Sequence, residues 1–311
     1  MSPTAQYSWP LLNLRLSGGK SKDGAGIEAW VKHENQTPAG AFKVRGALVY
    51  GNWLKETQPA MQGVVAATRG NFGQGVAIAA RLLGLKAVIV VPQGNSATKN
   101  RAILAQGAEL IEHGLDFQES LEVARSIAAH RVYNMCESFN ERLVMGTATY
   151  ALELFEGARK LDVVYVPIGL GSSICGIAAA RNALKLSTEI VGVVAAQSPS
   201  YALSFKQGKV VEAASNTAIA DGLACRVPNG EALEVIAQNV VRIVEVEEDE
   251  IADAMCAYFE DTQNVAEGAG AAALAAALKE KDELRGKRIG IVLSGGNVDR
   301  ETFLAALAGS K

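Results

Sequence analysis

One lysine stands in a setting that suits chemistry on a carbonyl group. Lys43 lies in the segment Ala41-Phe42-Lys43-Val44-Arg45-Gly46-Ala47. A lysine amine forms a Schiff base with an aldehyde cofactor, and it acts as a base once a substrate amine displaces it. A Lys followed two residues later by Arg is also common as a solvated surface pair. The segment alone therefore leaves both interpretations open.

Three further segments share a pattern in which an apolar stretch ends in a glycine-containing turn. They are Thr68-Arg69-Gly70-Asn71-Phe72, Gly169-Leu170-Gly171-Ser172-Ser173 and Ser294-Gly295-Gly296-Asn297. The free backbone N–H groups of such a turn, and of a helix that starts there, suit a carboxylate or a phosphate. Each turn also has a plain structural interpretation, as a helix start or a shaped loop. The second segment is neither a Walker A loop nor a dinucleotide loop, because no GK[ST] follows and Ile174 takes the place of the last glycine.

The elements that position these segments alternate along the chain between β-branched runs and stretches of helical periodicity. Strands are expected at 64–67, 87–91, 163–166, 190–194, 242–246 and 288–293. Helices are expected at 73–83, 98–106, 117–129, 147–156, 174–184, 248–261 and 270–279. The strands are apolar throughout rather than alternating, which is typical of parallel strands covered by helices on both faces. An open, doubly wound α/β fold is predicted, with ligands at the carboxyl ends of the strands.

Composition and charge argue against several classes of protein. The chain has 311 residues, of which 49% are hydrophobic and 20% charged, as in ordinary folded globular proteins. A formal net charge of −3 gives no reason to expect nucleic acid or an anionic membrane as a partner. The sequence has neither a membrane-spanning apolar run nor a signal-like start, so we expect a cytoplasmic protein. The four cysteines and three histidines are scattered, so neither a metal site nor a Ser-His-Asp triad is expected.

Taken together and in this order, the four segments resemble the fold-type II pyridoxal-phosphate enzymes, in particular the branch of serine/threonine dehydratases and serine racemase. The likeness runs from about residue 10 to residue 297. It implies an α/β fold with two doubly wound, open parallel-sheet lobes, of the tryptophan synthase β-subunit-like kind. Residues 1–50 with 146–311 would form a large domain that binds pyridoxal 5'-phosphate, and residues 51–145 a small domain that closes over substrate. A homodimer is also implied.

The resemblance gives each segment a role. In the family a Phe-Lys-x-Arg-Gly-Ala segment supplies the Schiff-base lysine, so Lys43 is the expected catalytic residue. The expected contacts of the cofactor are Lys43, Phe42, Asn71, Gly169, Leu170, Gly171, Ser172, Ser173 and Ser294, with the phosphate on the residues from 169 to 173. The expected contacts of the substrate are Thr68, Arg69, Gly70, Asn71, Phe72 and Gly222. Glu267 also matches a family segment near the site.

Several residues depart from the family pattern. Phe72 stands where the family often has His, so it offers no imidazole, and Leu170 interrupts a run of glycines. Arg69 takes the position of the serine that works on the opposite cofactor face in serine racemase. A guanidinium is a poor proton acceptor, which argues against racemisation. One hypothesis is that Arg69 binds a second carboxylate or a polar tail of the substrate.

The function implied by the resemblance is β-elimination of water from a hydroxy amino acid such as threonine or serine, which yields a 2-oxo acid and ammonia. The alternatives are an amino-acid racemase, a β-replacement enzyme, or a catalytically silent ligand-binding protein on the same scaffold. The sequence does not choose between threonine, serine, allothreonine, 3-hydroxyaspartate and bulkier substrates. Apart from a second copy of the chain, a small amino acid is the partner we expect.

Overall fold

A computed structural model of the chain describes residues 1–19, 26–115, 117–158 and 160–309. The chain divides into two compact units. Unit 1 comprises Met1–Gln36 and Ala148–Lys311, and unit 2 comprises Thr37–Thr147. The large and small domains expected above have somewhat different bounds. Their roles stay a prediction, because a compact unit does not by itself show what it binds.

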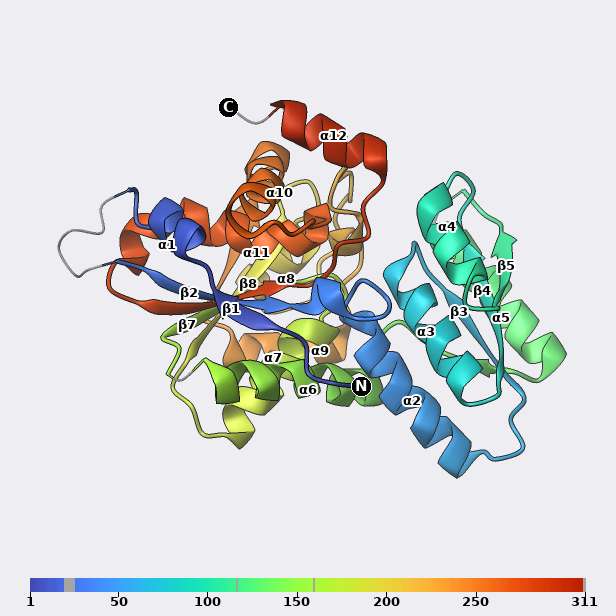
Figure 1. The fold of residues 1–311 in the computed structure, drawn as a ribbon. Helices are drawn as coiled ribbons and strands as arrows, with labels where there is room; N and C mark the ends of the chain where they lie inside the picture. Colours follow the sequence, from blue (N-terminus) through green and yellow to red (C-terminus); the bar gives the residue numbers. More distant parts are fainter. Residues whose placement is uncertain (20–25, 116, 159, 310–311) are drawn as a thin grey trace. The chain divides into compact units, whose positions relative to one another are not determined.

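Unit 1 is built on a six-stranded sheet with the order β1-β2-β10-β7-β8-β9 (Figure 1). The strands are β1 (Gln6–Ser8), β2 (Glu28–His33), β7 (Val163–Pro167), β8 (Glu189–Ala195), β9 (Arg242–Val246) and β10 (Arg288–Leu293). All pairs are parallel except β1 with β2, which is antiparallel and forms one edge. The four strands expected here from the sequence are confirmed, whereas β1 and β2 were not predicted. The sequence of β2 does not look like a buried strand because it includes the polar residues Lys32 and His33, which are buried in the structure.

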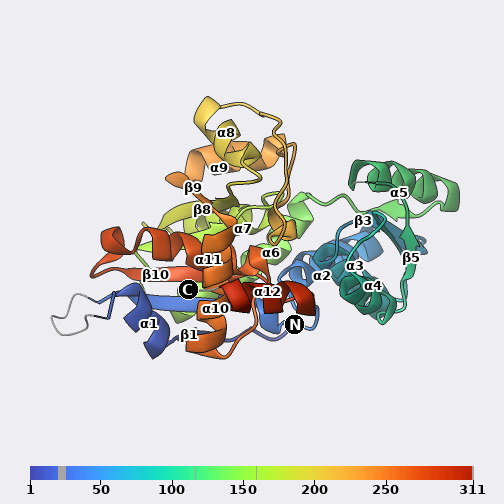
Figure 2. The ribbon, with the colours of Figure 1, turned by 90° about the horizontal axis from the view of Figure 1, so that it is seen from above.

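Helices cover both faces of this sheet. They are α1 (Pro10–Leu16), α6 (Glu141–Gly157), α7 (Ser172–Ala183), α8 (Ser200–Gln207), α9 (Gly230–Asn239), α10 (Glu248–Thr262), α11 (Gly268–Lys279) and α12 (Arg300–Gly309). Helices α1, α10 and α11 pack over one face, and α7 and α9 lie on the other (Figure 1). Helix α8 lies against α9 and β9, at the β9 edge of the sheet (Figure 2). Three short 3-10 turns occur at Glu34–Gln36, Asp221–Leu223 and Lys281–Leu284.

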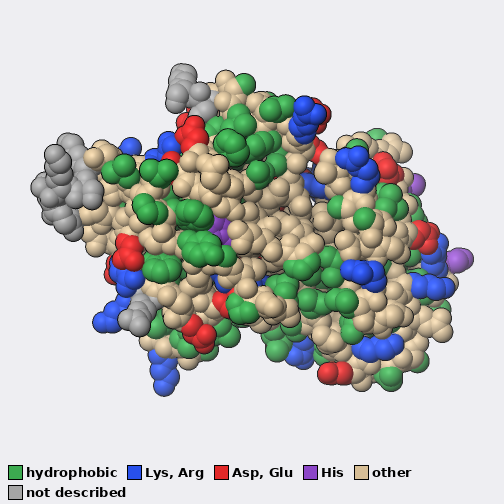
Figure 3. Space-filling view, in the orientation of Figure 1, with side chains coloured by type: hydrophobic (Ala, Val, Ile, Leu, Met, Phe, Trp, Pro, Cys, Tyr) green, Lys and Arg blue, Asp and Glu red, His purple; other side chains and the backbone are tan. Residues whose placement is uncertain are grey.

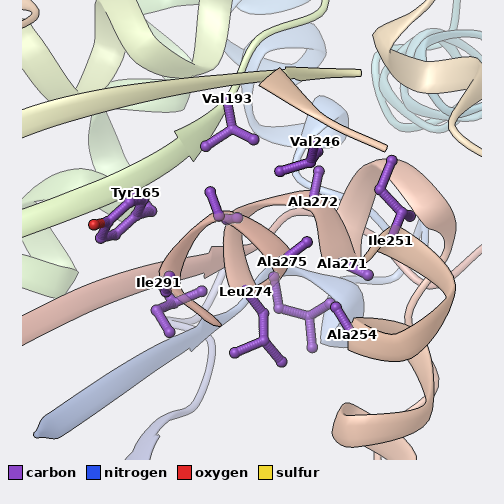
Figure 4. Close-up of a cluster of buried hydrophobic side chains, with 14 of the residues drawn as sticks. Tyr165, Val193, Val246, Ile251, Ala254, Ala271, Ala272, Leu274, Ala275 and Ile291 are labelled. Atoms are coloured by element: carbon purple, nitrogen blue, oxygen red, sulfur yellow. The ribbon is translucent and has the colours of Figure 1, made fainter. Parts of the chain in front are cut away.

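The core of unit 1 is centred on α11, a helix made mostly of alanine. Its side chains from Gly268 to Ala277 are buried between the sheet and α10. Figure 4 shows Ala271, Ala272, Leu274 and Ala275 of α11 among the strand and α10 side chains Tyr165, Val193, Val246, Ile251, Ala254 and Ile291. Small side chains let a helix backbone approach its neighbours closely, so the alanine run fixes α11 deep in the unit. Two loops that meet the start of α11, the one before Asp221–Leu223 and the one after β10, are thereby fixed as well.

Unit 2 contains a four-stranded parallel sheet with the order β5-β4-β3-β6. Its strands are β3 (Gly63–Ala67), β4 (Lys86–Val91), β5 (Glu109–Glu112) and β6 (Asn134–Met135), and its helices are α2 (Lys43–Thr57), α3 (Asn71–Leu82), α4 (Ala97–Leu104) and α5 (Phe117–Arg131). Val64 and Ala66 face the core formed with α2, α3 and α4, while Val65 and Ala67 face α5. Because successive residues of a strand point to opposite faces, such a strand must be apolar throughout.

The expected open α/β architecture with parallel sheets is confirmed. All seven expected helices are present, although the one predicted at 147–156 begins at Glu141 and the one at 73–83 begins at Asn71. Helices α1, α2, α8, α9 and α12 were not predicted. Within the described part of the chain, no helix combines the length and apolarity that crossing a membrane requires. Charged side chains of both signs are scattered over the face shown in Figure 3.

Candidate functional site

Lys43 is the first residue of α2 and is half-buried. Its Nζ lies 4.6 Å from the centre of the Phe42 ring, which is itself buried. The turn before the helix is held by Thr37, whose hydroxyl donates to the carbonyl oxygen of Ala41 at 2.7 Å and accepts from its N–H at 3.0 Å. A lysine whose amine lies over a buried aromatic ring is restricted in the directions that this amine can take. This setting differs from that of a solvated surface lysine.

The start of α2 is packed closely by α3 and by the first residues of α6, both of which belong to unit 2. A Cβ added to Gly75 of α3 would lie 3.0 Å from the Val44 nitrogen and 3.1 Å from the Lys43 carbonyl carbon. A Cβ on Gly146 of α6 would run into the Arg45 backbone. Both glycines are therefore required for the helices to approach this closely. The Lys43 backbone is thereby fixed against the second turn of α3.

The segment between β3 and α3 is ordered by hydrogen bonds of Thr68 within the turn and to β4. The Thr68 hydroxyl accepts from the Gly70 N–H at 3.0 Å, and the Thr68 N–H donates to the Val90 carbonyl oxygen at 3.0 Å. Gly70 precedes α3 with φ of 157°, and the helix has no side-chain cap among the described residues. A helix start without a side-chain cap presents N–H groups to an anion. Because Gly75 lies one turn further along α3, this anion site belongs to the same corner of unit 2 as Lys43.

In unit 1, the loop Gly169–Ser173 joins β7 to α7. Gly171 caps the helix with φ of 99°, a left-handed conformation that glycine adopts without strain, and Ser172 and Ser173 are buried in the first turn. The Tyr150 and Ser173 hydroxyls are 2.6 Å apart. Tyr201 donates to the Leu170 carbonyl oxygen at 3.0 Å. Two tyrosines from different helices therefore hold this loop in place.

Three of the expected contacts in unit 1 lie together around the start of α11. A Cβ on Gly169 would press on the Gly222 carbonyl oxygen, and one on Gly222 would lie 2.8 Å from the Ala269 Cβ. The Ser294 hydroxyl, buried at the end of β10, donates to the Ala269 carbonyl oxygen at 3.3 Å. Glu267 is the buried residue that precedes α11, and its N–H donates to Gly295 at 3.1 Å.

The segment before Gly222 is held by Glu248, the first residue of α10. Its carboxylate accepts from the Thr217 hydroxyl at 2.6 Å and from the Ile219 N–H at 3.0 Å. The Thr217 hydroxyl also accepts from the Ala220 N–H at 3.2 Å. These bonds fix the chain two residues before Asp221–Leu223, which presents Gly222 to Gly169.

The donors of the Gly169–Ser173 loop fit a phosphate group. The loop opens a twelve-residue helix, its left-handed Gly171 turns backbone N–H groups inward, and two serine hydroxyls lie in the first turn. Ser294 adds an uncharged hydroxyl at the end of a neighbouring strand, β10. A hydroxyl bonds to a ring nitrogen without forcing that nitrogen to carry a proton. Phosphate and ring nitrogen are two of the groups by which a protein holds pyridoxal phosphate, and unit 1 has donors for both.

Three buried titratable groups of unit 1, His33, Cys175 and Cys225, have pKa values far from neutral pH. Burial raises the pKa of the Cys175 thiol in α7 to about 12 and that of Cys225 to about 11. Burial also lowers the pKa of His33 to about 4. No group of three or more His, Cys, Asp or Glu side chains that could hold a metal ion occurs within the described ranges. These side chains offer no obvious rival to a lysine as the reactive group.

The predicted site residues fall into two groups. Phe42, Lys43 and the segment 68–72 lie in unit 2, where Gly75 of α3 packs on the Lys43 backbone, and unit 1 brings Gly169–Ser173 together with Gly222 and Ser294 around Ala269. The sequence interpretation missed the residues that support them, which are Thr37, Gly75, Tyr150, Tyr201 and Glu248. Gly75 had a detectable signal, since a glycine inside a helical pattern often marks close packing. The tyrosines had none, because a tyrosine on a helix is usually just part of the core.

Comparison with known proteins decides which family this site belongs to. The sequence pattern of a family described as pyridoxal-phosphate dependent enzyme matches residues 10–295. The chain belongs to this family. The expected family, fold class and cofactor are thereby confirmed. The loops of this pyridoxal-phosphate-dependent enzyme carry donors that fit the cofactor.

Individual relatives show which enzymes of the family the chain is similar to. L-threonine ammonia-lyase of Thermotoga maritima is 36% identical over 275 residues, which cover 88% of this chain and 68% of that protein. L-threo-3-hydroxyaspartate ammonia-lyase of Saccharomyces cerevisiae is 31% identical over 303 residues, covering 97% of this chain and 91% of the yeast protein. Among solved structures, a pyridoxal 5'-phosphate-dependent aspartate racemase superposes with a TM-score of 0.88 at 28% identity, covering 96% of this chain and 91% of the racemase.

Proposed function

We propose that this enzyme eliminates water from a small β-hydroxy amino acid and releases a 2-oxo acid and ammonia. Relatives that are 36% and 37% identical to this chain are named L-threonine ammonia-lyase, and one that is 31% identical is named for 3-hydroxyaspartate. The observation that carries the proposal is the corner of unit 2 where Gly75 packs on the Lys43 backbone. This packing supports a role for Lys43 because Gly75 lies one turn from the start of α3, where we propose that the substrate carboxylate binds, and a base that removes the Cα proton of an amino acid must lie near that carboxylate.

The residues divide the work in the proposal. Bound pyridoxal phosphate supplies the electron sink that makes the Cα proton of the substrate acidic. Lys43 holds the cofactor aldehyde and moves that proton at its Nζ, while Phe42 restricts the lysine stem. The turn from Thr68 to Phe72 binds the substrate carboxylate, and Asn71 donates to the cofactor's phenolic oxygen. Phe72 is apolar and offers no proton to the leaving hydroxyl.

In unit 1, residues Gly169–Ser173 bind the phosphate and Ser294 faces the ring nitrogen. The roles of the two domains follow from this division. The domain of residues 1–50 and 146–311 binds the cofactor, and that of residues 51–145 closes over the substrate. Gly222 is proposed to border the substrate because it adjoins the phosphate loop.

Assembly and location extend the proposal. We expect a homodimer, as in the family that the sequence resembles, and light scattering of the loaded enzyme would test it. We also expect the cytoplasm. The four cysteines are free and buried, which is compatible with a reducing compartment.

The direct test is release of 2-oxo acid and ammonia from a panel of β-hydroxy amino acids by the purified, cofactor-loaded enzyme. Release that disappears in Lys43→Ala supports the proposal. Recovery of the substrate with its Cα configuration inverted, without ammonia, would establish a racemase instead. Consumption of an added thiol into a new amino acid would establish β-replacement. Full ammonia release by Lys43→Ala would contradict the role given to the lysine.

A further inference from the structure

Arg69 is an exposed cation at the carboxyl end of β3. Within the described part of the chain, the structure gives its guanidinium no hydrogen bond and no ion pair. The preceding residue, Thr68, is buried and bonded within the turn. Ligands of parallel α/β sheets bind at this end of the strands, so an unpaired guanidinium here is placed to meet a ligand rather than bulk solvent alone.

The same turn carries a second cationic side chain and a buried amide donor. Lys99 of α4 is buried, and its Cδ would lie 2.5 Å from a Cβ on Gly70, so its stem runs along the turn. Gln74 of α3 is also buried, and its Nε2 donates to none of the described residues. Side chains in a helix lean toward its N-terminus, which directs Gln74 toward Gly70 and Asn71. A buried donor without an acceptor is costly unless a ligand supplies one.

Arg69 and Gln74 add donors beyond those that one carboxylate requires. The first-turn N–H groups of α3 are enough for the α-carboxylate of an amino acid. Arg69 then has no task in the turnover of threonine or serine, whose side chains end in a hydroxyl or a methyl group. A guanidinium matches a carboxylate through two parallel hydrogen bonds, and it is the side chain best suited to such a group.

We propose that Arg69 binds a second carboxylate on the substrate, so that the preferred substrate is a 3-hydroxy dicarboxylic amino acid of the 3-hydroxyaspartate type. This rests on the proposed β-elimination. In that reaction the Cα–H and Cβ–O bonds break, water leaves and then re-enters to release ammonia. Oxaloacetate is the other product, so atoms balance without any oxidant or reductant. The name of the yeast relative, which refers to 3-hydroxyaspartate, is compatible with this assignment.

Three variants test the assignment. Arg69→Gln removes the charge but keeps an amide, and Arg69→Lys keeps the charge but loses the bidentate geometry. Arg81→Gln is the matched control, since Arg81 is an exposed arginine in the last turn of α3, the helix that follows Arg69, and is bonded to Gln106. The first readout is kcat and KM for 3-hydroxyaspartate and for threonine. The second readout is the Kd for malate and for lactate, measured by calorimetry. These two hydroxy acids differ by one carboxylate.

Wild type and Arg81→Gln should prefer 3-hydroxyaspartate over threonine and malate over lactate. Arg69→Gln should lose about 10- to 150-fold in kcat/KM for 3-hydroxyaspartate, mostly through KM, and less than about threefold for threonine. Arg69→Lys should fall between the two. Equal losses for both substrates, or an unchanged preference, would overturn the assignment while leaving β-elimination intact. If no hydroxy amino acid releases ammonia, the proposed function fails, and the malate measurement still decides whether Arg69 binds a second carboxylate.

Discussion

Gly169→Ala tests whether the loop Gly169–Ser173 binds the cofactor phosphate. The added methyl group would lie roughly 1 Å inside van der Waals contact with the Gly222 carbonyl oxygen, a backbone atom that cannot rotate away. Over-packing of this kind typically costs about 1–3 kcal/mol. Relief requires the loop or Asp221–Leu223 to shift, which misaligns the N–H groups at the start of α7. If that strain opposes phosphate binding, the Kd for pyridoxal phosphate rises about 5- to 150-fold.

The assay is a titration of cofactor-free protein with pyridoxal phosphate, followed by absorbance, together with urea unfolding of both forms. Gly230→Ala is the control in the same unit. Gly230 opens α9, and a Cβ there meets nothing within 4 Å. The control should bind the cofactor normally and be slightly more stable. Cofactor binding by Gly169→Ala that equals the control would refute the role assigned to this loop.

Two predictions concern stability at β2. The neutral His33 ring accepts from the Trp9 indole N–H at 3.0 Å, and burial lowers its pKa from 6.5 to about 4. The unfolded chain therefore binds the proton first as the pH falls. The contribution of His33 to the free energy of unfolding is fully present above pH 6.5 and is lost as the pH falls toward 4. At pH 5 the loss is about 2 kcal/mol. Urea unfolding at pH 7 and pH 5 should show this loss in wild type and much less of it in His33→Gln, whereas identical losses would contradict the assignment. Glu153→Gln removes the carboxylate 2.6 Å from the buried Lys32 ammonium and should cost about 3 kcal/mol in urea unfolding. The double variant Lys32→Met, Glu153→Met should recover most of that stability, and an equally unstable double variant would show that packing rather than charge is responsible.

The parts of the fold that could be predicted from the sequence are those with local signals. Strands β3, β4 and β10 are apolar on both faces, and the glycine turns that follow β3, β7 and β10 stand directly after them. Strand β2 escaped prediction because it contains Lys32 and His33, whose burial depends on Glu153 and Trp9. Those partners are distant in sequence or lie outside β2, so no local sequence pattern predicts these contacts.

The same distinction applies to the candidate site. Lys43, Asn71 and Ser294 stand in segments that a family resemblance can identify. Their supports depend on contacts across the chain, such as Tyr150 with Ser173 and Tyr201 with Leu170. A tyrosine that packs in a core and one that holds a ligand loop look alike in a sequence. The structure distinguishes them by the partner of the hydroxyl group.

The central claim is that Lys43 holds pyridoxal phosphate. The most direct measurement is borohydride reduction of the loaded enzyme, followed by proteolysis and mass spectrometry of the peptides. The reduced cofactor is expected to stay attached to the peptide containing Phe42 and Lys43, and Lys43→Ala is expected to retain no covalent cofactor. Attachment to another lysine, with the peptide containing Lys43 unmodified, would contradict it.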